Sequence, residues 1–124
     1  MRNTVLIVDD DALVHLLYKR HLEGAGYQLI NASNGVEALD VASRELPRLI
    51  IMDVMMPGTD GLTALRELKK GEATKSIPVI IVTANVGEHP ASRQESQFSG
   101  AGAFLTKPFS PAKLLAEVRR LAPL

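Results

Sequence analysis

Cysteine is absent from this sequence of 124 residues, and its absence excludes disulfide bonds, thiolate metal sites and cysteine nucleophiles. An excess of charge is absent as well, because 14 basic side chains balance 14 acidic ones. This balance argues against a nucleic-acid binder that relies on bulk positive charge. No apolar run is long enough for a membrane span, and two early aspartates interrupt the region where a signal peptide needs apolar residues. We therefore expect a cytoplasmic protein that does not bind membranes or contact nucleic acid directly.

The composition that remains is that of an ordinary globular protein. Hydrophobic residues make up 46% of the chain and charged residues 23%, which is not the balance of a disordered segment. The length matches a single domain over residues 1–124. At this size roughly two thirds of the unfolded chain's surface can be buried, so the core needs no cross-link.

Four short apolar runs predict the strands of a parallel sheet. They are rich in branched residues and do not alternate with polar ones, which is typical of strands buried on both faces. The runs are residues 5–8, 49–52, 79–82 and 103–105, and a weaker fifth strand is expected at residues 28–32.

Helical patterns lie between the predicted strands, at residues 12–24, 35–45, 62–70 and 111–121. Asp60 is a candidate N-cap for the third of these helices and Gly71 its stop. A further short helix is expected after Pro90, but few apolar residues there can form a buried side. Strand and helix alternate five times, which indicates an α/β fold with helices on both faces of one sheet.

Polar side chains follow the predicted strands directly, and the carboxyl ends of parallel strands meet at one edge of the sheet. These side chains are Asp9, Asp10 and Asp11 after the first strand, Asp53 after the third, Thr83 after the fourth and Lys107 before Pro108 after the fifth. The sequence therefore predicts a site that combines carboxylates, one hydroxyl and one ammonium group.

The gathered carboxylates predict a bound cation. Two unit charges about 4 Å apart repel by about 4 kcal/mol at an effective dielectric constant near 20, and oxygen ligands without His or Cys suit a hard ion such as Mg²⁺. An aspartate can also act as a nucleophile toward phosphorus. The alternative is that Asp9, Asp10 and Asp11 only cap the following helix, although capping leaves Asp53 unexplained.

The motifs VLIVDDD, LIIMDVMMPGTDG, VIIVTA and FLTKPF occur in this order along the chain. With them the sequence resembles the receiver domain of bacterial two-component response regulators, from Val5 to Leu121. The resemblance implies a flavodoxin-like (βα)5 fold, a doubly wound parallel sheet with strand order 2-1-3-4-5. It also implies a phosphorelay switch that accepts a phosphoryl group from a phosphohistidine.

The resemblance assigns a role to each residue of the predicted site. Asp53 is the implied phosphoacceptor. Mg²⁺, or Mn²⁺ in its place, is the implied cofactor. Its implied protein ligands are Asp9, Asp10, Asp53 and the backbone carbonyl of Met55, with Asp9 acting through water.

Three further roles concern the switch. Thr83 is expected to bond a phosphoryl oxygen, with Ala84 leaving room for it, and Lys107 to pair with the phosphate. Phe104 occupies the position of the family's switch aromatic. The segment between Thr83 and Lys107 is slightly longer than is usual in the family, which leaves the length and position of the fourth helix open.

The implied partners are a histidine kinase or a histidine phosphotransfer protein, and an effector that reads the switched surface. The protein is expected to be a monomer or a phosphorylation-dependent dimer, and to catalyse only its own phosphorylation and dephosphorylation. Two alternatives remain: a phosphatase or phosphotransferase with an aspartate nucleophile, and a pseudo-receiver that only binds partners. No insertion is large enough for the cap that such an enzyme needs over its substrate.

The first predicted helix carries apolar residues on more than one face, whereas an amphipathic helix needs only one buried stripe. We predict that some of Leu13, Val14, Leu16 and Leu17 form an exposed patch on which a kinase docks. The alternative is that these side chains are buried more deeply or are covered only by a second copy in a crystal dimer.

Overall fold

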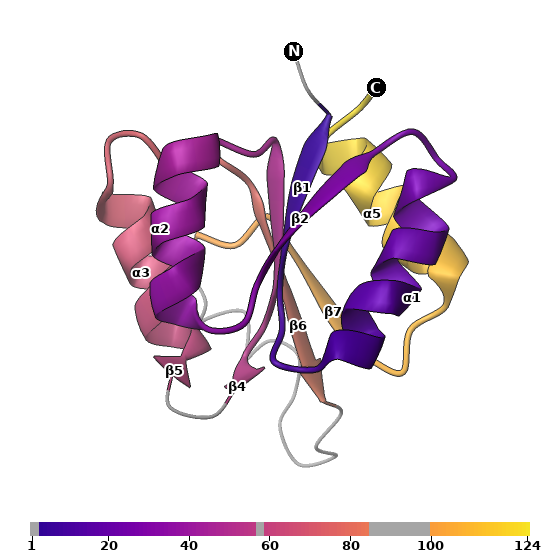
Figure 1. The fold of residues 1–124 in the computed structure, drawn as a ribbon, viewed down its shortest axis with the longest axis horizontal. Coiled ribbons are helices and arrows are strands. Elements are labelled where there is room, and N and C mark those ends of the chain that lie inside the picture. The colour runs from indigo at the N-terminus through magenta and orange to yellow at the C-terminus, as the bar shows by residue number, and fades with distance from the viewer. Residues whose placement is uncertain (1–2, 57–58, 85–99) are drawn as a thin grey trace.

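The computed structural model describes residues 3–56, 59–84 and 100–124 of the chain. Its central feature is a sheet of five parallel strands in the order β2-β1-β3-β6-β7 (Figure 1). The strands are β1 (Thr4–Val8), β2 (Gln28–Ala32), β3 (Leu49–Asp53), β6 (Val79–Ala84) and β7 (Ala103–Lys107). This order confirms the predicted flavodoxin-like topology.

The helices cover both faces of the sheet (Figure 1). They are α1 (Ala12–Glu23), α2 (Gly35–Glu45), α3 (Gly61–Lys70) and α5 (Pro111–Leu121). In the figure α2 and α3 lie on one side, and α1 and α5 lie on the other. The predicted helices 35–45 and 111–121 have the observed bounds, while α1 ends one residue earlier and α3 begins one residue earlier than expected.

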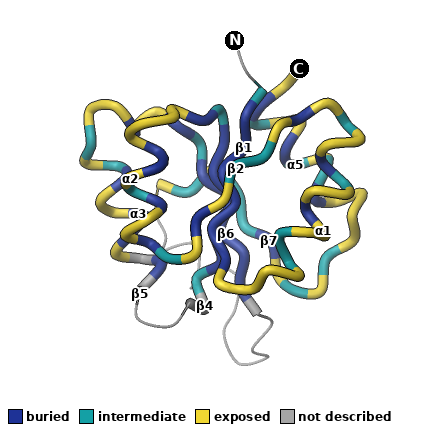
Figure 2. Tube along the Cα trace, viewed as in Figure 1, coloured by how far each residue is buried: buried dark blue, intermediate teal, exposed yellow. Residues whose placement is uncertain are grey.

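The core consists of two hydrophobic clusters separated by the sheet. Successive strand residues point to opposite faces, so in β1 Leu6 and Val8 join the cluster under α2 and α3, whereas Val5 and Ile7 join the cluster under α1 and α5. The central strands are accordingly buried (Figure 2). This two-sided burial is the reason that the strands are apolar without alternation.

Side-chain caps begin three of the helices. Asp11 accepts a hydrogen bond from the backbone N–H of Leu13 at 2.9 Å, and Asn34 does so from Glu37 at 2.9 Å. Ser110 caps α5 in the same way, with Pro111 at the first helical position. Such caps satisfy N–H groups that have no partner inside the helix. Asp60, the predicted cap of α3, directly precedes that helix.

One small element was not predicted. After β3 the chain forms a two-stranded antiparallel sheet of β4 (Met55–Met56) and β5 (Thr59–Asp60). The expected helix after Pro90 falls in residues 85–99, outside the described part of the chain. None of the described helices has the length and apolar character needed to cross a membrane.

Leu46 ends α2 with a φ of 49°, in the left-handed region. A side chain with a Cβ costs roughly 1–2 kcal/mol there, and the Leu46 side chain is largely exposed. We expect Leu46→Gly to raise the free energy of unfolding by about 0.5–1 kcal/mol, as measured by urea denaturation. Leu46→Ala is the control, since it keeps the Cβ and should give no gain. Equal destabilisation by both substitutions would contradict the prediction.

Candidate functional site

Four predicted site residues meet at the carboxyl-terminal edge of the sheet. Asp9 follows β1, Asp53 ends β3, Thr83 lies next to the end of β6, and Lys107 ends β7. The strand register places Asp53 beside Val82 of the neighbouring strand. Asp9, Asp53 and Thr83 are 3%, 6% and 6% exposed. The site is therefore a buried polar cluster, as the spacing of the strand ends predicts.

An ion pair joins Asp53 and Lys107. The Lys107 Nζ donates a hydrogen bond of 2.6 Å to the Asp53 Oδ2, and the lysine side chain is 40% exposed. Burial by itself lowers the pKa of Lys107, but the hydrogen bond and charge of Asp53, with Asp9 and Asp10, outweigh it and raise the pKa above its ordinary value. Lys107 therefore supplies a positive charge to a carboxylate that is itself removed from water.

Asp9 is held through three separate groups. Its backbone N–H donates to the Ala32 carbonyl at 3.1 Å, and its Oδ1 accepts from the Asp11 N–H at 2.9 Å. Its backbone carbonyl lies 2.7 Å from the Nε2 of His15. Burial raises the pKa of Asp9, and the negative charge of Asp53 and a hydrogen bond with the Asp53 side chain raise it further. The hydrogen bond from the Asp11 N–H and the charge of Lys107 lower it, but they do not outweigh the other effects. The geometry thus holds two carboxyl groups close together at a cost in repulsion.

The donor set suits a hard divalent cation. In the described part of the chain, three or more metal-ligating side chains do not converge, so the side chains offer the buried pair Asp9 and Asp53 rather than a closed cage. Mg²⁺ prefers such an arrangement, because it binds through one or two carboxylates and keeps several waters. Burial is the main cause of the raised pKa of Asp9, and a cation would relieve the smaller part that comes from the charge of Asp53.

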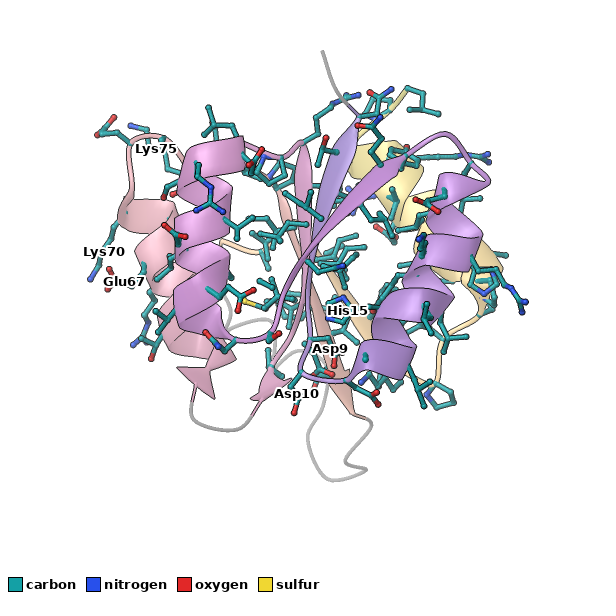
Figure 3. All side chains as sticks on the ribbon, viewed as in Figure 1. Asp9, Asp10, His15, Glu67, Lys70 and Lys75 are labelled. Atoms are coloured by element: carbon teal, nitrogen blue, oxygen red, sulfur yellow. The ribbon has the colours of Figure 1, made fainter. Side chains whose placement is uncertain are left out.

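The other predicted residues take distinct positions. Asp10 is exposed in the turn after Asp9 (Figure 3). Met55 lies in β4, two residues beyond Asp53. Phe104 is partly buried and packs against the core cluster under α2 and α3. Asp11 is the N-cap of α1, so the capping alternative holds for that one aspartate of the three.

An apolar surface lies next to the site on α1. Leu13, Leu16 and Leu17 are 69%, 60% and 57% exposed, which confirms the predicted exposure of this patch; Val14 is half-buried. Beside the patch is a groove of about 380 Å³. Its walls include Val14, Leu17, Tyr18, Lys107, Pro108 and Leu114. The groove therefore extends from α1 to the lysine of the candidate site, where the Lys107–Pro108 peptide bond is cis.

Sequence reasoning assigned no role to His15, which the structure places against the Asp9 backbone. The six-residue separation of His15 and Asp9 has no recognisable pattern, because the contact depends on how α1 packs on the sheet. Tyr18 was missed as well. Its phenol is buried, and burial together with the charges of Asp9 and Asp53 raises its pKa.

The family model that matches this sequence describes response regulators, and two of the matching relatives are named as regulators. A family model described as the response regulator receiver domain matches residues 5–119. The chain is 43% identical over 122 residues to the response regulator PleD of Caulobacter vibrioides, covering 98% of this chain and 26% of PleD. It is 41% identical over 116 residues to the phosphate regulon transcriptional regulatory protein PhoB of Pseudomonas aeruginosa, covering 94% of this chain and 50% of PhoB. The chain thus spans half or less of these two relatives.

Solved structures share the fold over the whole chain. A putative response regulator from Chloroflexus aurantiacus J-10-fl superposes with a TM-score of 0.87 at 34% identity and full coverage of both chains. The receiver domain of the sensor histidine kinase PA1611 from Pseudomonas aeruginosa PAO1 superposes with a TM-score of 0.86 at 27% identity, again with full coverage. That structure has a magnesium ion coordinated in its active site cleft.

Proposed function

This chain belongs to the response regulator receiver domain family, and we propose from this premise that it is a cytoplasmic phosphorelay switch with Asp53 as its phosphoacceptor. Residues 1–124 would act as one receiver unit. The observation that carries the proposal is the buried Asp53 carboxylate, paired at 2.6 Å with Lys107 and facing Asp9. Asp9 and Asp53 lie buried together although like charges repel each other, and such a costly arrangement favours a chemical role over a purely structural one.

The proposed reaction is a transfer between two side chains. A carboxylate oxygen of Asp53 attacks the phosphorus of a phosphohistidine, a new P–O bond forms, and the P–N bond breaks. The bonding electrons of the P–N bond go to the departing imidazole of the donor. In the product, Lys107 and the hydroxyl of Thr83 bind oxygens of the phosphoryl group, which stabilises negative charge at fixed positions.

We assign the divalent cation to Asp9, Asp10, Asp53 and the Met55 carbonyl. When bound, Mg²⁺ neutralises charge on the carboxylates and on the phosphoryl oxygens. Asp9 is pre-positioned for this task by its three backbone and side-chain contacts. The magnesium ion in the PA1611 receiver structure supports the assignment. Mn²⁺ is expected to bind at the same residues and to support the same reaction in place of Mg²⁺.

The proposed output depends on Thr83 and Phe104. A phosphoryl group adds about −1.5 to −2 charge and would draw the Thr83 hydroxyl toward Asp53. Phe104, which is partly buried on the neighbouring strand, would then turn inward and gain up to roughly 1.5–3 kcal/mol of apolar burial. A bias of about 1.4 kcal/mol already changes a population ratio tenfold. The surface read by an effector or a second copy would change accordingly.

The proposal is tested by incubating the protein with Mg²⁺ and acetyl phosphate, followed by intact-mass measurement and a phosphate-release assay. A stoichiometric adduct that persists is expected. Rapid multiple turnover of the donor would instead support an aspartate-nucleophile phosphatase. Neither adduct nor turnover would support a pseudo-receiver that works by binding alone.

We also propose that the exposed α1 patch of Leu13, Leu16 and Leu17 docks the phosphohistidine donor. Leu13→Asp and Leu16→Asp are expected to slow transfer from a histidine kinase or phosphotransfer protein by about tenfold or more, while labelling by acetyl phosphate is unchanged. The physical reason is that a charge placed in the centre of an apolar contact must be desolvated on docking.

Val36→Asp is the matched control for this prediction, because Val36 is a 73% exposed apolar residue on α2. It should leave both reactions unchanged. Equal loss with the protein donor and the small donor in the α1 variants would indicate damaged folding rather than lost docking, and would contradict the prediction.

A further inference from the structure

His15 joins the start of α1 to two neighbouring strands. Its Nε2 lies 2.7 Å from the backbone carbonyl oxygen of Asp9, which follows β1. Its Nδ1 lies 2.9 Å from the Oδ1 of Asn31 in β2. In Figure 3 the His15 ring lies beside Asp9, and Asp10 projects from the turn beyond it. Both ring nitrogens are therefore engaged.

The peptide groups of Asp9 are fixed from β2 by two routes. Ala32 accepts the Asp9 N–H directly at 3.1 Å, and the preceding residue, Asn31, holds the imidazole that binds the Asp9 carbonyl. A carbonyl oxygen only accepts hydrogen bonds, so Nε2 carries the donated proton. At Nδ1 the side-chain amide of Asn31, whose nitrogen can donate to an unprotonated ring nitrogen, restrains the rotation of the ring about its side-chain bonds.

This restraint acts on the turn that presents the acidic pair. The Asp9 carboxylate is oriented by the Asp11 N–H, but that bond moves with the turn and cannot anchor it to the sheet. His15 reaches the turn from another element, and it anchors the peptide between Asp9 and Asp10. A shift of that peptide would displace both carboxylates together.

We propose that His15 is a positioning residue that sets the affinity of the acidic turn for a divalent cation. The inference rests on the proposed function, since it takes Asp9 and Asp10 as cation ligands. His15 contacts neither the phosphoacceptor nor the cation in this account, and acts only through the Asp9 peptide. Groups that orient metal ligands typically contribute about 10–100-fold to metal affinity. We place His15 near the lower end, at about tenfold, because it acts on backbone.

Two substitutions of similar size separate positioning from packing. His15→Leu removes the donor, whereas His15→Gln keeps an N–H that can reach the Asp9 carbonyl. His15 and Asn31 line a surface groove of about 470 Å³. The groove leaves room for either a leucine or a glutamine side chain at position 15. Isothermal titration calorimetry with Mg²⁺ is expected to show a Kd about tenfold weaker for His15→Leu, and within about threefold of the original protein for His15→Gln.

Urea unfolding without Mg²⁺ provides the readout for a structural role. If His15 only packs α1 onto the sheet, His15→Leu changes the free energy of unfolding but leaves the Kd of the folded protein unchanged, which overturns the proposal. Equal Kd losses in the Leu and Gln variants also overturn it. If His15→Leu does not fold, Asn31→Ala decides: it removes the outer anchor of the ring at an exposed position, and an unchanged Kd overturns the proposal.

The same titration separates a failure of the cation assignment from a failure of the positioning role of His15. If the original protein binds no Mg²⁺, the cation assignment under the proposed function fails, and the role of His15 fails with it. If the original protein binds Mg²⁺ and His15→Leu binds it equally well, only the positioning role is wrong.

Discussion

Asp53→Asn is expected to abolish phosphoryl acceptance, so that no adduct is detected by intact mass after treatment with acetyl phosphate and Mg²⁺. The substitution keeps the size and shape of the side chain, and its carbonyl oxygen can still accept the Lys107 hydrogen bond that now measures 2.6 Å. The amide removes the carboxylate that attacks phosphorus. The loss is therefore expected in a protein that remains folded.

Asp40→Asn is the matched control for Asp53→Asn. Asp40 is an exposed aspartate of α2 that pairs with Arg44 at 2.7 Å, and surface pairs of this kind contribute little to stability. This variant should be labelled normally. A full phosphoryl mass gain in Asp53→Asn would show that another residue accepts the group, and would overturn the assignment of Asp53.

The central strands β1, β3 and β6 were predictable because each is a short apolar run that is buried on both faces. Residues 49–52 illustrate this, since every side chain in that run is buried. The hairpin of β4 and β5 was not predictable in the same way. It consists of two-residue strands, too short for any periodicity, and the only local signal is the Pro57-Gly58 pair between them.

The site was predictable to the extent that parallel strands end at one edge. This reasoning placed Asp9, Asp53, Thr83 and Lys107 together, as the structure has them. Asp53 and Lys107 lie on β3 and β7, which are separated by β6. Their direct pairing depends on side-chain geometry across that strand, which the sequence does not reveal. His15 depends on the packing of α1 against β2, which no local pattern contains.

Lys107→Ala is expected to leave Mg²⁺ binding intact but to abolish most of the conformational response of Phe104 to a phosphoryl group on Asp53. Lys107 lies three residues beyond Phe104 on β7. Its ammonium group forms an ion pair with Asp53, the proposed phosphoacceptor. Without it, a phosphoryl group on Asp53 cannot draw the end of β7 toward the site through an ion pair. Beryllofluoride, which mimics the phosphoryl group, should shift the NMR signals of the Phe104 ring in the original protein and lose most of that effect in Lys107→Ala.

Lys113→Ala is the control for this last prediction, because Lys113 is an exposed lysine on α5 and the removal of its charge tests for a general electrostatic effect. It should preserve the Phe104 shifts. Undiminished Phe104 shifts in Lys107→Ala would show that Thr83 transmits the change without the lysine. Unchanged Phe104 signals in the original protein, alongside clear shifts at Asp53, would instead make Phe104 a fixed core residue and contradict the proposed switch. The comparison therefore shows whether the site is coupled to Phe104 through Thr83 on β6, through Lys107 on β7, or through neither residue.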